Sequence, residues 1–332
     1  MMTNMRLIEK IRHRMHTLYR QKIVCEQYPM LTPINRKEWQ KQGAIGVVYM
    51  LHHIAQKNSM GIPTNEDLIV SPDFLEAIII KYKKKGFEFI SLDQLNEIIS
   101  STKKTEAPFI AFTIDDGYLD NYTNALPVFI RHQVPFTIFI ASDFINKKAI
   151  LWWDILERLV LNNESIIINN KIYPCRIFQE KWDTFRIIRE SILRLDQTNL
   201  EAELAKMFSY YKIDWYEPIC HQAMSWQQVK KISQHPLCTI GGHTVSHLAL
   251  NQLNEETLYN EIAENIAKLQ EVIGESIHHF AYPYGSPNEI GEREFQLIKT
   301  FNLKTAFTAY GGCITESNKT NSTHLPRVYL HE

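Results

Sequence analysis

Short apolar runs alternate with amphipathic helical patterns along most of this chain, and this alternation limits its possible folds more than any other feature. Parallel strands joined by helical crossovers produce such an order. Buried strands are predicted at Ile45–Leu51, Phe87–Ile90, Phe109–Thr113, Pro135–Ala141, Leu237–Ile240, Ile277–Ala281, Lys304–Thr308 and Arg327–Leu330. Helices are predicted at Phe74–Lys85, Leu92–Ser100, Asn121–His132, Ser225–Gln234, Asn254–Ile273 and Asn288–Phe301. We therefore predict an α/β fold, a distorted (β/α) barrel with seven or eight parallel strands.

The alternation is interrupted between residues 162 and 217. A hairpin is predicted at Ser165–Ile177 with its turn at Asn169-Asn170, followed by helices at Trp182–Leu195 and Leu200–Tyr211. Loops of barrels accept such additions. We expect residues 162–217 to be an insertion within a barrel that spans residues 44–330.

Residues 1–43 form a basic helical extension in this prediction. Apolar residues recur at helical spacing beneath several lysines and arginines, so the pattern predicts an amphipathic helix. Such a helix docks on its own domain or lies on anionic lipid, and the first arrangement is the more common.

The composition restricts the partners and the compartment. The formal net charge of −1 gives the chain no general attraction to nucleic acid. The sequence has 5 cysteines and no C-x-x-C pair, which is typical of reduced thiols. Neither a signal peptide nor a membrane span is predicted. We expect a cytoplasmic protein, with possible peripheral contact with the inner membrane through the first helix.

Two adjacent carboxylates, Asp115 and Asp116, end the predicted strand at Phe109–Thr113. Ligand sites of parallel α/β folds lie at the carboxyl ends of the strands. Side chains alternate along a strand, so the two carboxylates leave it in different directions. The competing interpretation is that Asp116 only caps the next helix while Gly117 makes a turn.

A second polar cluster, Ile240–Leu248, follows a later strand and contains His243 and His247. One helical turn or a curled loop brings two imidazoles at this spacing to one side. Two imidazoles and one carboxylate suit a divalent ion such as zinc. The preceding Gly241 and Gly242 would let the backbone bend tightly, although an H-x-x-x-H pattern alone is weak evidence.

A third cluster, Phe280–Gly285, also follows a predicted strand. Pro283 fixes the turn, and the rings of Tyr282 and Tyr284 can form the wall of a sugar pocket. Taken alone, P-Y-G is also an ordinary turn sequence.

Together and in this order, T-I-D-D-G-Y, G-H-T-V-S-H and A-Y-P-Y-G resemble the motifs of the metal-dependent polysaccharide deacetylases, the chitooligosaccharide-deacetylase-like carbohydrate esterase family 4. The similarity extends to V-V-Y-M-L-H-H, F-T-I-F-I-A and M-S-W-Q-Q-V, and so covers residues 44–330 apart from the insertion.

The resemblance implies a role for each matching residue. Asp115 is the expected general base for a water activated by the metal, and Asp116, His243 and His247 are the expected metal ligands. The backbone N–H of Tyr284 is expected to help hold the oxyanion of the tetrahedral intermediate. The metal is expected to be zinc.

The chain departs from the family at two points. Many members carry an arginine, which holds the catalytic aspartate, at the position of Ala281, and we expect Arg327 to supply the guanidinium from another strand. The general-acid histidine has no clear match. His324 and His331 are the candidates near the C-terminus, and His52 or His53 can line the pocket from the first strand.

We therefore expect hydrolysis of N-acetyl groups from amino sugars in a polysaccharide, a glycan precursor or a lipid-linked sugar. A carbohydrate-binding protein that does not turn over its ligand is the first alternative, favoured by the missing arginine and the unassigned acid. A retaining glycoside hydrolase ranks third, because it needs two carboxylates about 5 Å apart that face each other.

Overall fold

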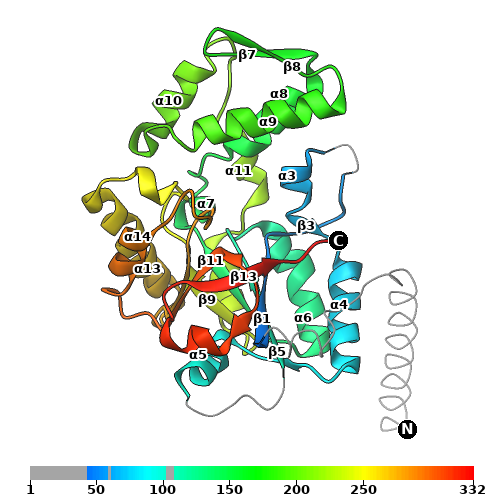
Figure 1. The fold of residues 1–332 in the computed structure, drawn as a ribbon, viewed down its shortest axis with the longest axis vertical. Helices are drawn as coiled ribbons and strands as arrows, with labels where there is room; N and C mark the ends of the chain where they lie inside the picture. The colour runs from blue at the N-terminus through cyan, green and yellow to red at the C-terminus, as the bar shows by residue number, and fades with distance from the viewer. Residues whose placement is uncertain (1–42, 59–60, 102–107) are drawn as a thin grey trace.

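Seven parallel strands close into a barrel at the centre of the molecule (Figure 1). The computed structural model describes residues 43–58, 61–101 and 108–332. β5 pairs with β1 and closes the ring, which confirms the predicted distorted (β/α) barrel. Around the ring the order is β1 (Ala44–Leu51), β13 (Leu325–Tyr329), β11 (Thr305–Gly311), β10 (His279–Ala281), β9 (Cys238–Gly242), β6 (Phe136–Ile140) and β5 (Phe109–Ile114).

Two further strands join the sheet outside the ring. β4 (Glu88–Phe89) pairs in parallel with β5 only, so the predicted strand at Phe87–Ile90 does not belong to the closed barrel. β12 (Ile314–Thr315) pairs antiparallel with β1. The number of barrel strands is therefore seven.

An apolar cluster lies inside the barrel. Alternate residues of a strand point to the same face, and those that point inward pack as one cluster with α5 (Leu92–Ser100). The cluster includes Val48, Ala111, Phe139, Phe307 and Leu325, all of them buried. Polar residues lie on both sides of this cluster. His279 and Thr305 contact each other on its amino-terminal side, and the candidate site lies on the other side, at the carboxyl ends of the strands.

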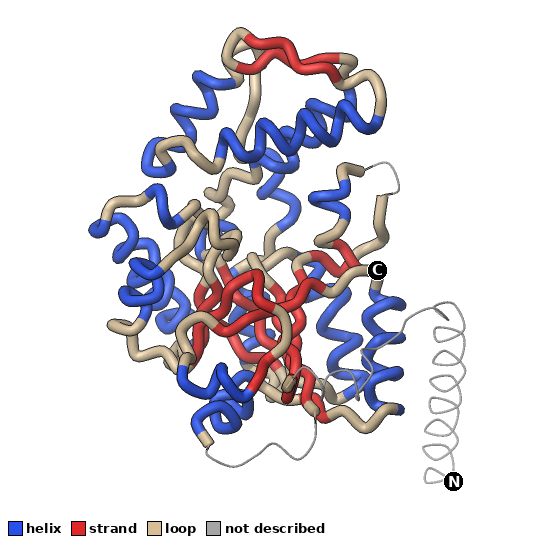
Figure 2. Tube along the Cα trace, in the orientation of Figure 1, coloured by secondary structure: helices blue, strands red, loops and turns tan. Residues whose placement is uncertain are grey.

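Helices surround the strands (Figure 2), and their ends carry the expected caps. The Ser225 side chain accepts a hydrogen bond from the backbone N–H of Gln228, and Asn254 accepts one from Thr257. The outer helices are α4 (Pro72–Lys84), α6 (Leu126–His132), α12 (Trp226–Ser233), α13 (Glu255–Ile273) and α14 (Glu292–Ile298).

The helix predicted at Asn121–His132 begins as a π-helix over Asn121–Ala125 and continues as α6. The N–H of Leu126 donates to the carbonyl of Asn121, five residues back. Pro127 has no N–H to continue the regular ladder, so the change of helix type lies where the sequence predicts a kink.

Residues 152–222, here called the lobe, extend from one end of the barrel and form the upper part of Figure 1. Asn169 and Asn170 both have positive φ, 49° and 60°, as a tight hairpin turn requires. The apolar residues of the lobe belong to a cluster that continues into Leu258 and Ile262 of α13, so the lobe packs against the barrel. Its elements are α8 (Trp152–Asn162), β7 (Ser165–Ile168), β8 (Lys171–Pro174), α9 (Phe178–Ile192), α10 (Leu200–Met207) and α11 (Glu217–Gln222).

Short elements complete the rim of the barrel. β2 (His53–Ile54) pairs with β3 (Ile69–Val70), and α3 (Pro63–Glu66) lies between them in the chain. α7 (Ser142–Ile145) follows β6.

The predicted basic extension at residues 1–43 falls almost entirely on residues that are not described. Its contact with lipid, and the cytoplasmic location, stay predictions. Within the described ranges, no helix combines the length and the apolar character needed to cross a bilayer.

Candidate active site

Asp115 and Asp116 lie at the carboxyl end of β5, and the backbone turns between them. The N–H of Asp115 still donates to the carbonyl of Leu51 on β1, at 2.9 Å. Asp116 has φ 77°, in the left-handed region that non-glycine residues rarely adopt. The two carboxylates therefore point to different partners because the chain turns after Asp115, and not because of strand alternation as predicted.

The carboxylate of Asp115 is held by the guanidinium of Arg327 on β13. Nη1 and Nη2 of Arg327 donate to Oδ1 and Oδ2 of Asp115 at 2.7 and 2.8 Å. The remaining donors reach Thr113 Oγ1 and the carbonyl of Thr308. Each of the two charged residues is 2% exposed. Arg327 therefore holds Asp115 from β13, as the sequence analysis expected. Ala281, at the position where the resemblance would place an arginine, lies on β10.

Opposing influences act on the pKa of Asp115. Burial raises the pKa of this carboxyl, but the charge and hydrogen bonds of Arg327 outweigh the burial and hold it below its ordinary range. The group is therefore ionised at neutral pH.

Asp116, His243 and His247 bring three ligand atoms together. Asp116 Oδ1 lies 3.3 Å from His243 Nε2 and 3.4 Å from His247 Nε2. All three residues are buried, and their ligand atoms lie within 4.8 Å of one another. Asp116 Oδ1 accepts no hydrogen bond from any residue in the described ranges, although it is fully buried.

The surroundings orient the imidazole of His243 and keep that of His247 neutral. His243 Nδ1 is 2.6 Å from the carbonyl of Ala281, so this nitrogen carries the proton and Nε2 presents its lone pair. Burial lowers the pKa of His247 to about 4, against the attraction of Asp116, and the ring is neutral at pH 7.

A divalent cation fits this donor set. Tetrahedral ligands at the zinc distance of about 2.0–2.1 Å lie about 3.3 Å apart, which is the separation of the Asp116 oxygen from each imidazole nitrogen. Three protein ligands also leave positions for water and substrate. The unpaired oxygen of Asp116 and the two imidazole nitrogens that face it are the groups that such an ion would bind.

Strained backbone recurs at the three strand ends. Asp116, His247 and Tyr284 all have positive φ, at 77°, 56° and 57°. Such conformations persist only where the surrounding structure holds them, and they concentrate at functional sites. His243 and His247 therefore meet through a curled loop, in which the N–H of His247 donates to Thr244 Oγ1 at 3.1 Å.

The two glycines before His243 serve close packing. A Cβ on Gly241 would lie 2.5 Å from the ring of Phe139, and one on Gly242 would lie 2.9 Å from Asn265 Oδ1. That same oxygen accepts the N–H of His243 at 3.0 Å. Neither glycine has positive φ, so the predicted tight bend at this point is wrong.

Tyr284 follows β10 and forms one wall of the site. Its ring centroid lies 4.7 Å from that of His247, and its hydroxyl accepts a hydrogen bond from Trp152 Nε1 at 3.2 Å. Among the described residues nothing accepts its backbone N–H. This donor is the one that the sequence analysis assigned to the oxyanion.

The structure does not bring His324 to the site. It stacks on Phe295 at 4.6 Å between ring centroids and contacts Asn321, and it does not line the pocket. His52, at the end of β1, lies there instead, with Nε2 4.0 Å from Asp115 Oδ2. Burial lowers the pKa of His52, so its ring is neutral. His331 also lines the pocket.

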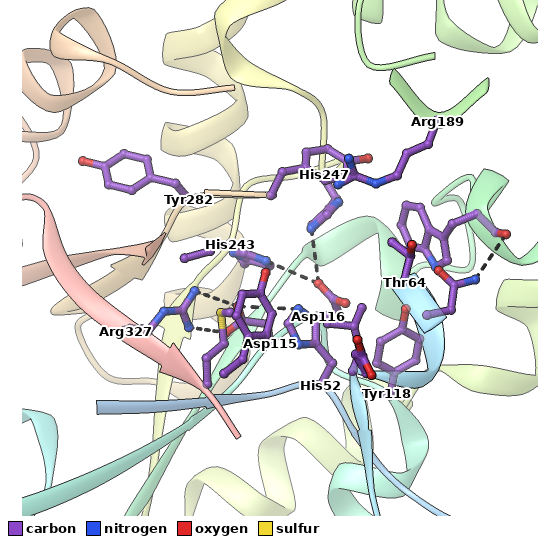
Figure 3. A pocket seen from close by; sticks show the side chains of 18 of the residues that line it. His52, Thr64, Asp115, Asp116, Tyr118, Arg189, His243, His247, Tyr282 and Arg327 are labelled. Carbon is purple, nitrogen blue, oxygen red and sulfur yellow. Dashed lines mark hydrogen bonds and ion pairs between the residues drawn. The ribbon is translucent and has the colours of Figure 1, made fainter. Parts of the chain in front are cut away.

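These residues surround a cavity of about 320 Å³ (Figure 3). Part of its lining was missed by the sequence analysis. Trp152 and Trp153 come from the start of α8, Arg189 comes from α9, and Thr64 and Asn65 come from α3. A Trp-Trp pair ahead of an amphipathic helix was the available signal for the first two.

Comparisons with known proteins agree with this geometry. The model of the family described as polysaccharide deacetylase matches residues 102–171 and 197–304. A stretch of 119 residues is 26% identical to YxkH of Bacillus subtilis (strain 168), whose name places it among the polysaccharide deacetylases. That match covers 36% of this chain, and it spans only 40% of the length of the curated relative.

Two solved structures share the fold. The deacetylase PplD of Streptococcus pyogenes, in complex with acetate, aligns with a TM-score of 0.56 and 16% identity over 86% of this chain and 92% of its own. BC0361, a polysaccharide deacetylase from Bacillus cereus, aligns with a TM-score of 0.54 and 18% identity over 86% of this chain and 65% of its own. The family match covers more than half of the chain and includes both aspartates, both histidines and Tyr284, and the chain belongs to the polysaccharide deacetylase family.

Proposed function

We propose that this protein hydrolyses N-acetyl groups from amino sugars in a polysaccharide or a glycan precursor, with a divalent metal, zinc in the first instance. One observation carries the proposal. The buried, unpaired oxygen of Asp116 faces two imidazole nitrogens, beside a second carboxylate that Arg327 keeps ionised.

Asp116, His243 and His247 are the residues that would hold the metal. When bound, such an ion lowers the pKa of water to about 7 and polarises an amide carbonyl. Apart from the contacts among these three side chains, no residue in the described part of the chain competes for their ligand atoms.

Asp115 is the base in this proposal. Its carboxylate takes a proton from water as the water oxygen attacks the acetyl carbon. The pair with Arg327 fixes both carboxylate oxygens in place, and a positioned base of this kind contributes roughly 10²–10⁴-fold to a rate. The backbone N–H of Tyr284 donates to the oxygen that becomes negative, an interaction worth about 3 kcal/mol.

His52 completes the proton path. The bond between the acetyl carbon and the sugar nitrogen breaks only if the nitrogen gains a proton. His52 is neutral and lies 4.0 Å from Asp115 Oδ2, and it is placed to pass on the proton that Asp115 has received. The products are acetate and the amine of the sugar.

The aromatic residues provide a surface for the sugar ring. Trp153 lies edge-on to His247 and Tyr284, with ring centroids 5.7 and 6.5 Å apart. Aromatic faces pack well against the apolar side of a sugar, and their polar edges can contact hydroxyls. The acetyl group would then lie toward His243 and His247 at the end of the pocket.

The test is acetate release from a panel of N-acetylated glycans, with and without a chelator, and with zinc added back. We expect activity that disappears with the chelator, returns with zinc, and is lost in Asp115→Asn. Asp183→Asn, an exposed acid on α9, is the matched control and should retain activity. Activity that survives both chelation and Asp115→Asn would contradict the mechanism, and glycan binding without acetate release would favour the carbohydrate-binding alternative.

A further inference from the structure

α9 carries two arginines, Arg186 and Arg189, and their surroundings differ. Arg186 lies 3.9 Å from Asp183, with its guanidinium over the ring of Trp182, and faces solvent. Arg194, just after the helix, is also exposed. Arg189 is partly buried and lines the cavity that contains Asp115, Asp116 and the two histidines.

The guanidinium of Arg189 has no acceptor within the described part of the chain. No hydrogen bond or ion pair joins its side chain to another described residue. Figure 3 shows it reaching from the lobe toward His247. Asp67, an acid that also lines the cavity, is exposed and makes no ion pair with it. A permanently charged group with five donors is costly to desolvate without a partner.

The chemistry of guanidinium selects the missing partner. Its planar fork matches a carboxylate or a phosphate through two parallel hydrogen bonds. An N-acetylated sugar and its hydroxyls are neutral, so they leave this charge unbalanced. We infer that Arg189 binds an anionic group, a carboxylate or a phosphate, that the acetylated glycan carries outside its acetyl group. The inference rests on the proposed function, because it assigns the substrate of the same pocket.

The position of Arg189 in the chain supports a role in selectivity. The family match stops at residue 171 and resumes at residue 197, so the segment that contains Arg189 lies outside it. Asp115, Asp116, His243, His247 and Tyr284 lie inside the match, and His52 and Arg327 lie outside it but at the barrel strands β1 and β13. The barrel therefore supplies the reaction groups, and the lobe adds a cation that distinguishes charged from neutral substrates.

The experiment compares three probes in binding and in turnover. The neutral probe is the methyl glycoside of N-acetylglucosamine, the phosphate probe is N-acetylglucosamine 1-phosphate, and the carboxylate probe is N-acetylmuramic acid. Binding is measured by calorimetry on the full chain with Asp115→Asn, which prevents turnover. Acetate release is measured on the chain with Asp115 intact. Each background also receives Arg189→Gln, or Arg186→Gln as the control on the same helix.

We expect at least one anionic probe to bind about tenfold to a hundredfold more tightly than the neutral probe, as a charge-assisted pair would give. Arg189→Gln should remove this preference without changing binding of the neutral probe, and Arg186→Gln should retain it. The probe that shows the preference identifies the anion as phosphate or carboxylate.

Equal losses for all probes in Arg189→Gln, or no preference for either anion, would overturn the inference. If the preference exists and depends on Arg189 but no acetate is released, the proposed function fails while the anion site stands. A melting temperature equal to that of the parent chain shows that Arg189→Gln is folded.

Discussion

Asp115 and Asp116 are neighbours in the chain, equally buried, and yet they occupy opposite kinds of environment. Asp115 receives two hydrogen bonds from a buried guanidinium. Asp116 faces two imidazoles, and its Oδ1 accepts no hydrogen bond from any described residue. Arg327 supplies the positive charge that balances Asp115, whereas the cation that balances Asp116 has to be a bound ion.

This difference shows how one residue type can take two roles in one site. A carboxylate with a permanent protein cation stays ionised and fixed, which suits a base. A carboxylate that faces two imidazole nitrogens is an incomplete coordination shell, which suits a metal ligand. Three substitutions test this division and a fourth, remote from the site, serves for comparison, and they are described from the largest expected effect on catalysis to the smallest.

Asp116→Asn should reduce kcat/KM by about 10³-fold or more, because the metal supplies several kcal/mol of charge stabilisation. Zinc content after dialysis should fall in parallel. Zinc should raise the melting temperature of the unaltered protein and leave that of the variant unchanged. In metal-free buffer the variant should be no less stable than the parent, since no hydrogen bond is lost from Oδ1. A variant that retains zinc and activity would remove Asp116 from the ligand set.

Arg327→Met should destabilise the protein even without metal. It leaves Asp115 buried without a cation, a change that costs about 3–5 kcal/mol of unfolding free energy. The double variant with Asp115→Asn should recover part of this loss, because the stranded charge is then absent.

The same variant tests the pKa of Asp115. A base acts only when ionised, so activity falls as the pH drops through its pKa. Arg327 holds this pKa low, and its removal should move the acid limb of the pH–kcat/KM profile to higher pH. An unmoved limb would mean that another group is the base.

His52→Gln should lower kcat by about 10²-fold, the lower range for loss of a positioned proton donor. Zinc content should not change. His53→Gln is the matched control, because His53 bonds to Asp120 at 2.8 Å and does not line the pocket. Equal losses in the two variants, or a loss only in His324→Gln, would assign the proton path to another residue.

Glu76→Gln should leave kcat unchanged while it lowers stability. Glu76 on α4 is buried and pairs with Arg131 and His132, each at 2.9 Å. Breaking such a buried pair costs about 3 kcal/mol. Chemical denaturation and acetate release, measured on the same preparation, separate the two effects.

The pH dependence of that stability has a definite sign. Burial raises the pKa of Glu76, but His132 and Arg131 together lower it. The stabilisation is therefore full above the unfolded pKa of about 4.3 and is lost as the pH falls through the folded pKa. The difference in unfolding free energy between Glu76→Gln and the parent chain should shrink below about pH 4.

Strand patterns and motif order were sufficient to predict the barrel and most of the site. The positions of polar residues directly after apolar runs predict that Asp115, Asp116, His243, His247 and Tyr284 meet at one rim, and all five line the cavity there. Such residues lie next to their strands, so local periodicity fixes their position.

Residues whose position depends on packing over long distances were harder to predict. His52 is an exception, because alternation along β1 puts it on the inward face with Val48 and Met50, and this local pattern distinguishes it from His53. The approach of α9 to the rim depends on how the lobe packs against the barrel, and no local pattern in its sequence reveals that Arg189 points inward.

Asp115 and Arg327 are 212 residues apart, and β13, which carries the arginine, is the last strand of the ring. During synthesis, the ribosome releases the aspartate long before its counter-ion exists. Contacts this remote in sequence form late and slow the folding of a domain. Activity therefore requires that the whole barrel has been translated and closed, and a nascent chain that stops before β13 should be inactive.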